Sequence, residues 1–237
     1  MRVNQYLARC GLASRRKAEA LVIGGSVRVN GTVIRDLATV INEGDKVEVD
    51  GKAVTAAAEN VYIVMNKPRA VVTTCDEQFG RRTVMDVLQE GMKGTGGRAR
   101  VFPVGRLDYD TEGLLVLTSD GDFARKITHP SCRVPKTYVA KLDVKLTEGD
   151  LDKLRQGVEI SPEARGALTV AAESVRFIGQ YEVEIVIREG KNRQVRKMFA
   201  AVGAQVLRLR RIAIGKLTLG NLRPGEWKYI KDLPKKI

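Results

Sequence analysis

Residues that bind metals or form disulfide bonds are scarce in this sequence. Its 237 residues include three cysteines, Cys10, Cys75 and Cys132, and one histidine, His129. No Cys-x-x-Cys motif occurs, and His129 does not complete a recognisable zinc site with cysteines so far apart in the chain. We therefore expect no metal and no cofactor, and three buried free thiols in a reducing, cytoplasmic compartment.

Long apolar segments are absent, and acidic residues are outnumbered. No run of about 18 apolar residues occurs, and Arg2 and Arg9 interrupt the N-terminus, so the sequence predicts neither a membrane span nor a signal segment. Aspartate and glutamate total 28 against 41 lysines and arginines, which gives a net charge of +13. This imbalance predicts a polyanionic partner, and nucleic acid fits better than a membrane surface because the N-terminal apolar face is modest.

The first part of the chain has the pattern of a small basic module. Apolar spacing predicts helices over residues 2–10 and 15–23, with Ser14 as the N-cap of the second. Val27 to Val29, the turn Asn30-Gly31 and residues 32–34 then predict a β-hairpin. Residues 2–35 carry seven basic side chains against Glu19 alone. The candidate RNA-contacting residues of this module are Arg2, Arg9, Ser14, Arg15, Arg16, Lys17 and Arg28.

The order of two helices, a Gly-x-x-Ser-Arg-Arg sequence between them and a following Gly-Gly-x-Val-x-Val-Asn-Gly resembles the S4-like RNA-binding module shared with a ribosomal small-subunit protein. The resemblance implies a binder of structured RNA. We expect this domain to span residues 1–52 and a linker to span residues 53–60, which show no core pattern. The remainder, residues 61–237, would form a catalytic domain.

The pattern of the larger domain predicts an α+β fold, with a mixed, mainly antiparallel sheet flanked by helices. Strands are predicted over 61–65, 114–117, 135–142, 166–177, 181–187, 206–211, 216–219 and 227–230. Helices are predicted over 83–90, 123–128 and 148–157. In the strand from Pro135, Tyr138 shares one face with Ala140 and Leu142.

The stretch from Gly105 to Gly121 is a polar loop that leads into an unbroken apolar strand and ends at a turn. Asp108 therefore lies on a loop supported by a sheet, where catalytic groups concentrate. On its own, an aspartate in this position more often caps a turn. A metal-dependent phosphodiesterase is an alternative, because further acids lie close to Asp108: Asp110, Glu112, Asp120 and Asp122. No metal-ligand spacing is recognisable among them.

Gly105-Arg106-Leu107-Asp108, followed by Thr-x-Gly-Leu-Leu-Val-Leu-Thr-x-Asp-Gly, resembles the active-site signature of RNA pseudouridine synthases of the RsuA/RluB branch. The resemblance implies that Asp108 is the nucleophile. It also implies that Tyr138, in a Lys-x-Tyr-x-Val setting, packs on the target base, and that Arg196, in Glu-Gly-Lys-Asn-Arg-Gln-Val-Arg, is the basic partner of the aspartate. Lys67, in Asn-Lys-Pro, would support the site structurally.

The chemistry of uridine isomerisation suits these residue types. A carboxylate can form a covalent intermediate, an arginine keeps it ionised, and a tyrosine ring can stack on uracil or move a proton. Whether Asp108 attacks the ring or the sugar carbon stays open. Arg106 could fill the gap left by a flipped base or hold a flanking phosphate.

Basic residues also follow the third motif, where residues 188–216 hold nine of them against Glu189 alone. Alternation of Leu207 and Leu209 with Arg208 and Arg210 predicts a strand with a basic stripe over a buried face. The candidate RNA-contacting residues here are Lys191, Arg193, Lys197 and Arg208.

The sequence therefore predicts a monomeric enzyme that isomerises uridine in ribosomal RNA. A large-subunit target, met as a precursor or as naked RNA, is favoured, and a small-subunit target stays open. The alternative from another class is a non-catalytic RNA-binding or ribosome-assembly protein. That alternative leaves Asp108, Tyr138 and Arg196, in three separate motifs, without an explanation.

Overall fold

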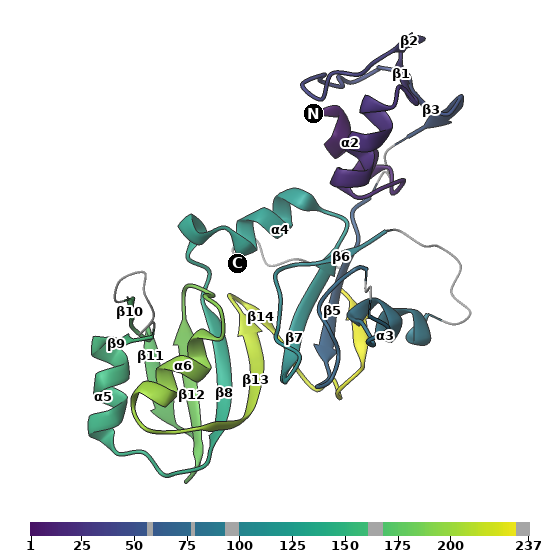
Figure 1. The fold of residues 1–237 in the computed structure, drawn as a ribbon. Coiled ribbons are helices and arrows are strands. Elements are labelled where there is room, and N and C mark those ends of the chain that lie inside the picture. The colour runs from purple at the N-terminus through teal and green to yellow at the C-terminus, as the bar shows by residue number, and fades with distance from the viewer. Residues whose placement is uncertain (56–58, 77–78, 93–99, 161–167, 231–237) are drawn as a thin grey trace. The chain divides into compact units, whose positions relative to one another are not determined.

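The computed structural model describes residues 1–55, 59–76, 79–92, 100–160 and 168–230. They form two compact units (Figure 1). The first comprises the described part of residues 1–61 with residues 100 and 101, and the second comprises the described parts of 62–95 and 102–230. No helix in these ranges is long and apolar enough to cross a membrane.

The first unit packs two helices on a small antiparallel sheet of strand order β2-β1-β3-β4. The Ser14 hydroxyl accepts a hydrogen bond from the Lys17 amide at 3.2 Å and so caps the second helix. Asn30 and Gly31 take φ values of 50° and 82°, which a tight hairpin turn requires. The elements are α1 (Val3–Arg9), α2 (Arg15–Ile23), β1 (Val27–Val29), β2 (Thr32–Val33), β3 (Val47–Val49) and β4 (Lys52–Val54).

Strand β4 runs into the segment expected to be a linker. Val54 pairs with Val47 of β3 and packs against the core of the first unit. The expected linker boundary at residue 53 is therefore too early, because a short edge strand with little apolar pattern is still held by its neighbour. Residues 56–58 lie outside the described part of the chain.

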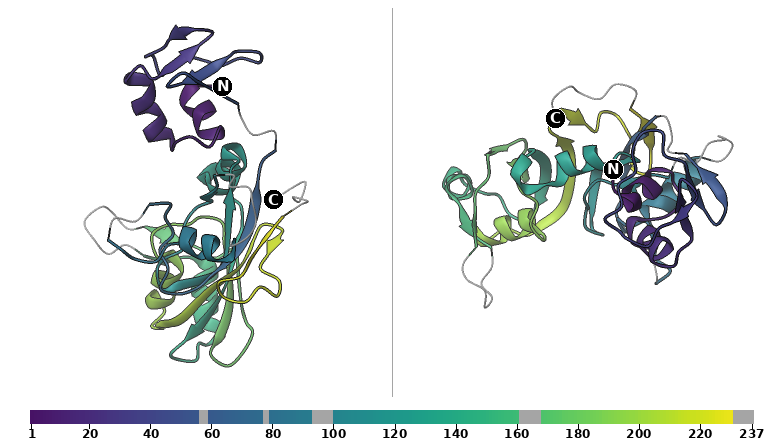
Figure 2. Two further views of the ribbon diagram at one scale, coloured as in Figure 1. Left: turned by 90° about the vertical axis from the view of Figure 1, so that its right-hand side faces the viewer. Right: turned by 90° about the horizontal axis from the view of Figure 1, so that it is seen from above.

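The second unit is built on one mixed sheet with strand order β11-β12-β8-β13-β7-β5-β15 (Figures 1 and 2). Neighbouring strands pair antiparallel except β7 and β13, which are parallel. The predicted α+β class is confirmed. The strands are β5 (Tyr62–Lys67), β6 (Phe102–Pro103), β7 (Thr111–Thr118), β8 (Lys136–Leu142), β11 (Ser174–Phe177), β12 (Glu182–Ile187), β13 (Val206–Ile214), β14 (Leu217–Thr218) and β15 (Trp227–Tyr229).

Helices and short turns complete this unit. Thr83 and Thr147 form capping boxes with Asp86 and Asp150 at the starts of two helices. A separate two-stranded sheet pairs β9 (Val158–Glu159) with β10 (Thr169–Val170). The helices are α3 (Val84–Gly91), α4 (Gly121–Thr128), α5 (Glu148–Gln156), α6 (Gln194–Ala201) and the 3₁₀ turn η1 (Pro130–Cys132).

Strand β7 lies inside the sheet, between β13 and β5, and contributes to the core. All eight of its residues are buried, and the side chains from Leu114 to Leu117 are fully inaccessible. An unbroken apolar run is the expected pattern for a strand covered on both faces. The segment that carries Asp108 is therefore anchored directly in the most buried strand of the unit.

Three expectations are wrong, and the first of them, the burial of the cysteines, concerns both units. Cys75 and Cys132 are exposed and Cys10 is half-buried, because the first two lie in a loop and at the end of η1 instead of on apolar faces. The strand expected over 166–177 is two strands, β10 and β11, since the Ala172 amide bonds to Leu154 O at 2.8 Å between them. Residues 166 and 167 lie outside the described ranges.

The third wrong expectation is the alternation along β13. The register of β13 against β8 shifts between Val206 and Arg208. The resulting irregularity leaves Leu207 48% exposed. Arg211 follows the regular alternation from Leu209 and is 5% exposed, so a basic residue lies on the buried face of the strand.

Candidate active site

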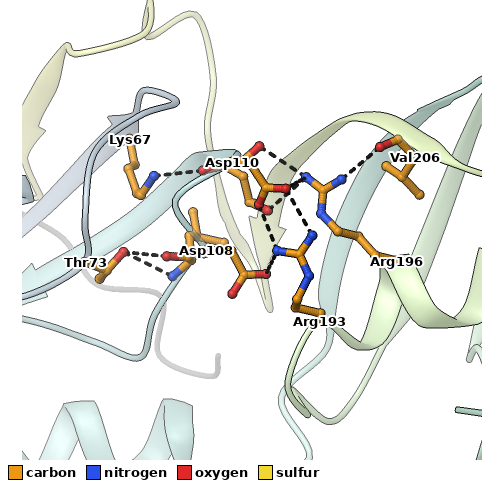
Figure 3. A network of polar contacts seen from close by, with 9 residues as sticks. Lys67, Thr73, Asp108, Asp110, Arg193, Arg196 and Val206 are labelled. Atoms are coloured by element: carbon orange, nitrogen blue, oxygen red, sulfur yellow. Dashed lines mark hydrogen bonds and ion pairs between the residues drawn. The ribbon is translucent and has the colours of Figure 1, made fainter. Parts of the chain in front are cut away.

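The loop that carries Asp108 joins β6 to β7 and is fixed by hydrogen bonds on both sides (Figure 3). The Thr73 hydroxyl donates to Leu107 O at 2.8 Å and accepts from Leu107 N at 3.3 Å. The Ala70 amide donates to Tyr109 O at 2.9 Å, and the Thr111 amide donates to Asp108 O at 3.1 Å. These contacts hold the backbone around Asp108 in one conformation, as a catalytic loop requires.

Asp108 lines a cavity of about 490 Å³. Tyr138 of β8 and Arg106 line the same cavity, so the structure brings together three residues predicted from separate positions. Tyr138 is 8% exposed, while Arg106 is exposed. The predicted face of β8 is confirmed, since Tyr138, Ala140 and Leu142 are all buried.

A carboxylate two residues after Asp108 organises the basic side chains of the site (Figure 3). Asp110 accepts hydrogen bonds from Arg193 at 3.3 Å and 3.2 Å, and its Oδ2 lies 3.1 Å from Arg196 Nη2. Arg193 Nη1 also lies 3.9 Å from Asp108 Oδ2. Arg193 therefore bridges the two aspartates, and Asp110 bridges the two arginines.

Electrostatics keeps this network charged. Burial alone would raise the pKa of Asp110, but the hydrogen bond from Arg193 and the charges of Arg196 and Arg193 hold that pKa below its ordinary value. The hydrogen bond to Asp110 raises the pKa of Arg193. Burial lowers the pKa of Arg196, while the charge of Asp110 opposes this shift.

The expected direct pairing of Arg196 with Asp108 is wrong in this structure. The guanidinium of Arg196 donates to Val206 O at 2.9 Å and to Asp110 O at 3.2 Å. The cation that contacts Asp108 is Arg193, which was expected only to contact RNA. Arg193 sits at the N-cap of α6 with φ of 50°, so it belongs to the loop facing Asp108 and not to a helical face shared with Lys197.

Lys67 lies next to this loop and is fully buried. Its Nζ donates to Pro68 O and Thr111 O, both at 2.9 Å, and so ties the end of β5 to the start of β7. Burial lowers the pKa of Lys67 to about 8, although the charges of Asp108, Asp110 and Glu112 oppose the shift.

The other predicted RNA-contacting residues are spread over both units. Lys191 lines the cavity and pairs with Glu189 at 3.1 Å, whereas Lys197 is exposed on α6. Arg208 is exposed and in addition pairs with the buried Glu112. In the first unit Ser14 is engaged as a helix cap. The other predicted RNA-contacting residues of that unit are all exposed: Arg2, Arg9, Arg15, Arg16, Lys17 and Arg28.

Sequence reasoning missed Lys136 and Arg211, which also line the cavity, and the bridging role of Asp110. The spacing of Asp110 from Asp108 was a usable signal, and so was the position of Arg211 two residues after Leu209, on the face expected to be buried. Within the described residues, no group of three or more His, Cys, Asp or Glu side chains is arranged to hold a metal. The acid-rich stretch after Asp108 thus has no ligand geometry there.

Comparison with known proteins places this cavity in context. Residues 61–201 match the family described as RNA pseudouridylate synthase, and residues 1–47 match the S4 domain. An uncharacterized RNA pseudouridine synthase of Aquifex aeolicus is 42% identical over 98% of this chain and 91% of its own. Ribosomal large subunit pseudouridine synthase B of Bacillus subtilis is 38% identical over 95% of this chain and 90% of its own.

A solved structure gives the same correspondence. The crystal structure of a pseudouridylate synthase superposes with a TM-score of 0.66 at 28% identity. The similarity covers 97% of this chain and 96% of the other. Both domains of the chain therefore have counterparts in proteins of one kind.

Proposed function

The chain belongs to the RNA pseudouridylate synthase family, and from this premise we propose that it converts a specific uridine of ribosomal RNA, in the large subunit, into pseudouridine. The chain is an isomerase that acts on RNA, and it carries an S4 domain. The ribosomal target is supported by the 38% identity to the Bacillus subtilis protein named for the large subunit. The observation that carries the catalytic assignment is Asp108 on the wall of a cavity that also contains Tyr138.

The reaction requires the target base to leave its stack. Unstacking costs a few kcal/mol, which phosphate contacts to basic side chains offset. Arg106 and Arg193 are exposed around the cavity and are placed to make such contacts. The base then lies inside, with the ring of Tyr138 as its stacking surface.

Asp108 is the nucleophile in this proposal. Its carboxylate forms a transient covalent bond with the target nucleotide, and Arg193 at 3.9 Å orients it. The N1–C1′ bond breaks with its electron pair on the ring, and the ring turns. The C5 atom then supplies the pair for the new bond to C1′, and the bond between Asp108 and the nucleotide breaks, with its electron pair returning to the carboxylate. The ring loses a proton at C5 and gains one at N1, so atoms balance without a cofactor.

Replacing Asp108 by asparagine tests this assignment while preserving the shape of the side chain. Pseudouridine would be mapped in the ribosomal RNA of cells that lack the protein and then receive wild type, Asp108→Asn or the control Asp152→Asn. Asp152 is exposed on α5 and pairs with Arg155. We expect one site in large-subunit RNA to disappear and to return with wild type and the control only.

Each other outcome identifies a different error. Restoration by Asp108→Asn would show that Asp108 is not the nucleophile. A lost site in small-subunit RNA would correct the substrate, and no lost site would favour a non-catalytic role in ribosome assembly. Activity of the purified protein in EDTA would exclude the metal-dependent alternative.

A further inference from the structure

The cavity that holds Asp108 and Tyr138 also contains a buried arginine without an acidic partner. Arg211 is 5% exposed, and its Nε donates to Leu114 O at 2.8 Å. Its Nη2 is buried and finds no hydrogen-bond partner among the described residues. A guanidinium offers five N–H donors, so most of this donor capacity is unused in a place that water reaches poorly.

A second cation stands beside it. Lys136 lines the same cavity, and the pKa of Lys136 is lowered first by burial and then by the charge of Arg211. Neither cation forms an ion pair within the part of the chain that the structure describes. A buried cation beside a half-buried one, with no acid between them, is costly unless an anionic group joins them.

The acids that line the cavity are already engaged elsewhere. Asp108 faces Arg193 at 3.9 Å. Glu189 pairs with Lys191 at 3.1 Å and accepts from the Gln194 amide at 3.1 Å. The cavity therefore retains positive charge at Arg211 and Lys136 that nothing in its lining neutralises.

The sheet places both cations next to the expected position of the base. Arg211 of β13 and Tyr138 of β8 are directly opposite each other in the antiparallel register. Side chains opposite each other on paired strands share one face of the sheet. Lys136 precedes Tyr138 by two residues on β8, which puts it on that face as well.

The depth of Arg211 distinguishes a base from a phosphate as its partner. In a flipped nucleotide the base enters the pocket, while the phosphates stay with the RNA backbone at the rim. Arg106 and Arg193 are among the exposed residues around this cavity and are suited to phosphates. Arg211 is more than nine-tenths buried, so the group that reaches it is the inserted ring.

We propose that Arg211, assisted by Lys136, donates hydrogen bonds to a uracil carbonyl and stabilises the negative charge of the ring while it is detached from the ribose. This role rests on the proposed function and deepens it. When the N1–C1′ bond breaks, the electron pair stays on the ring and spreads to its carbonyl oxygens. Arg211 gives up no proton in this step, and the ring loses its negative charge when the electron pair becomes the C5–C1′ bond.

Donors aimed at developing charge contribute chiefly in the transition state, and removing one typically lowers kcat by about 10²-fold to 10³-fold. We expect Arg211→Gln to lower kcat by that factor while the KM for RNA changes less than about threefold. The matched control is Arg210→Gln, because Arg210 is the exposed neighbour on the same strand. It should leave kcat unchanged.

A substrate change supplies a readout that a structural role would not move. RNA carrying 2-thiouridine or 4-thiouridine at the target position replaces one carbonyl oxygen by sulfur, a weaker acceptor. When sulfur replaces the oxygen that Arg211 contacts, kcat of the wild type should fall by about tenfold or more. The same replacement should lower kcat of Arg211→Gln only slightly. Sulfur at the other position should slow both proteins equally. Arg211→Lys is measured in parallel. If Arg211→Gln does not fold, the proposal is tested by whether the effects of Arg211→Lys and of the thio substitutions are non-additive.

The failures are distinguishable. Wild-type protein without activity on ribosomal RNA would refute the proposed function itself. An active wild type with Arg211→Gln within threefold of its kcat, or with additive effects of both thio substitutions, would refute the role of Arg211 alone. A rise in KM at constant kcat, with a weaker dependence of binding on salt, would show that Arg211 holds a phosphate instead.

Discussion

Substitution of Gly113 by alanine should separate two strands of the catalytic sheet. Gly113 lies in β7 with φ of 109° and faces Arg211 of β13 in the parallel pairing. An added Cβ would lie 2.7 Å from the Arg211 backbone nitrogen and closer still to its carbonyl oxygen. Both atoms belong to the backbone of a paired strand, so no side chain can move aside to make room.

The cost has two parts. A non-glycine residue in this region of φ is strained by about 1–3 kcal/mol. Relief of the clash must loosen a pairing of three residue pairs, Leu209 with Thr111, Arg210 with Glu112 and Arg211 with Gly113. Each hydrogen bond lost there contributes about 0.5–1.5 kcal/mol. We therefore expect a loss of roughly 3–5 kcal/mol in the free energy of unfolding, and a fall in Tm of about 10 °C.

Urea unfolding and thermal unfolding of the full chain measure this loss. The control is Gly121→Ala at the first residue of α4, where an added Cβ meets nothing within 4 Å. That variant should keep or slightly raise the stability. A loss below about 1 kcal/mol for Gly113→Ala would show that β7 and β13 can shift apart freely, and would refute the reasoning.

Two further substitutions probe the charges around Asp108. Because burial lowers the pKa of Lys67 to about 8, unfolding takes up protons between pH 8 and the ordinary lysine value. Wild-type stability should therefore contain a contribution that rises over that interval by at most about 3 kcal/mol. Urea unfolding from pH 7 to pH 10.5 should show this contribution in the wild type and not in Lys67→Met, and parallel curves would contradict it. Asp110→Asn should cost about 1–3 kcal/mol in urea unfolding, since it leaves the mostly buried Arg196 without its carboxylate. The control Asp152→Asn removes the exposed ion pair of Asp152 with Arg155 and should lower the free energy of unfolding by less than about 1 kcal/mol. Equal losses in Asp110→Asn and Asp152→Asn would contradict the role of Asp110.

Local signals in the sequence were sufficient for much of the fold. The Ser14 cap, the Asn30-Gly31 turn and the face shared by Tyr138 and Ala140 all depend on residues within a few positions of one another. The loop position of Asp108 follows from the apolar run after it, because a continuously buried strand leaves polar residues only at its ends. Such features need no knowledge of which strands pair.

The remaining features depend on pairing between distant strands. The exposure of Leu207 follows from a register shift between β13 and β8, which no periodicity in β13 encodes. The partners of Arg196 are Val206 and Asp110, the latter 86 positions away, so a motif could predict its presence near the site but not its contacts. The exposure of Cys132 likewise depends on where η1 meets the surface.

The parallel contact of β7 with β13 also divides the enzyme's working parts between two halves of one sheet. The segment with Asp108 continues into β7, whereas Tyr138 and Arg211 belong to β8 and β13 across the junction. The pairing of β7 with β13 has three residue pairs, fewer than the pairing of β8 with β13 or of β5 with β7. Figure 1 shows these strands side by side. A slight shear there would misalign the nucleophile and the base pocket while both halves stay folded. A nucleotide that contacts both halves would therefore hold Asp108 and the base pocket in register during the reaction.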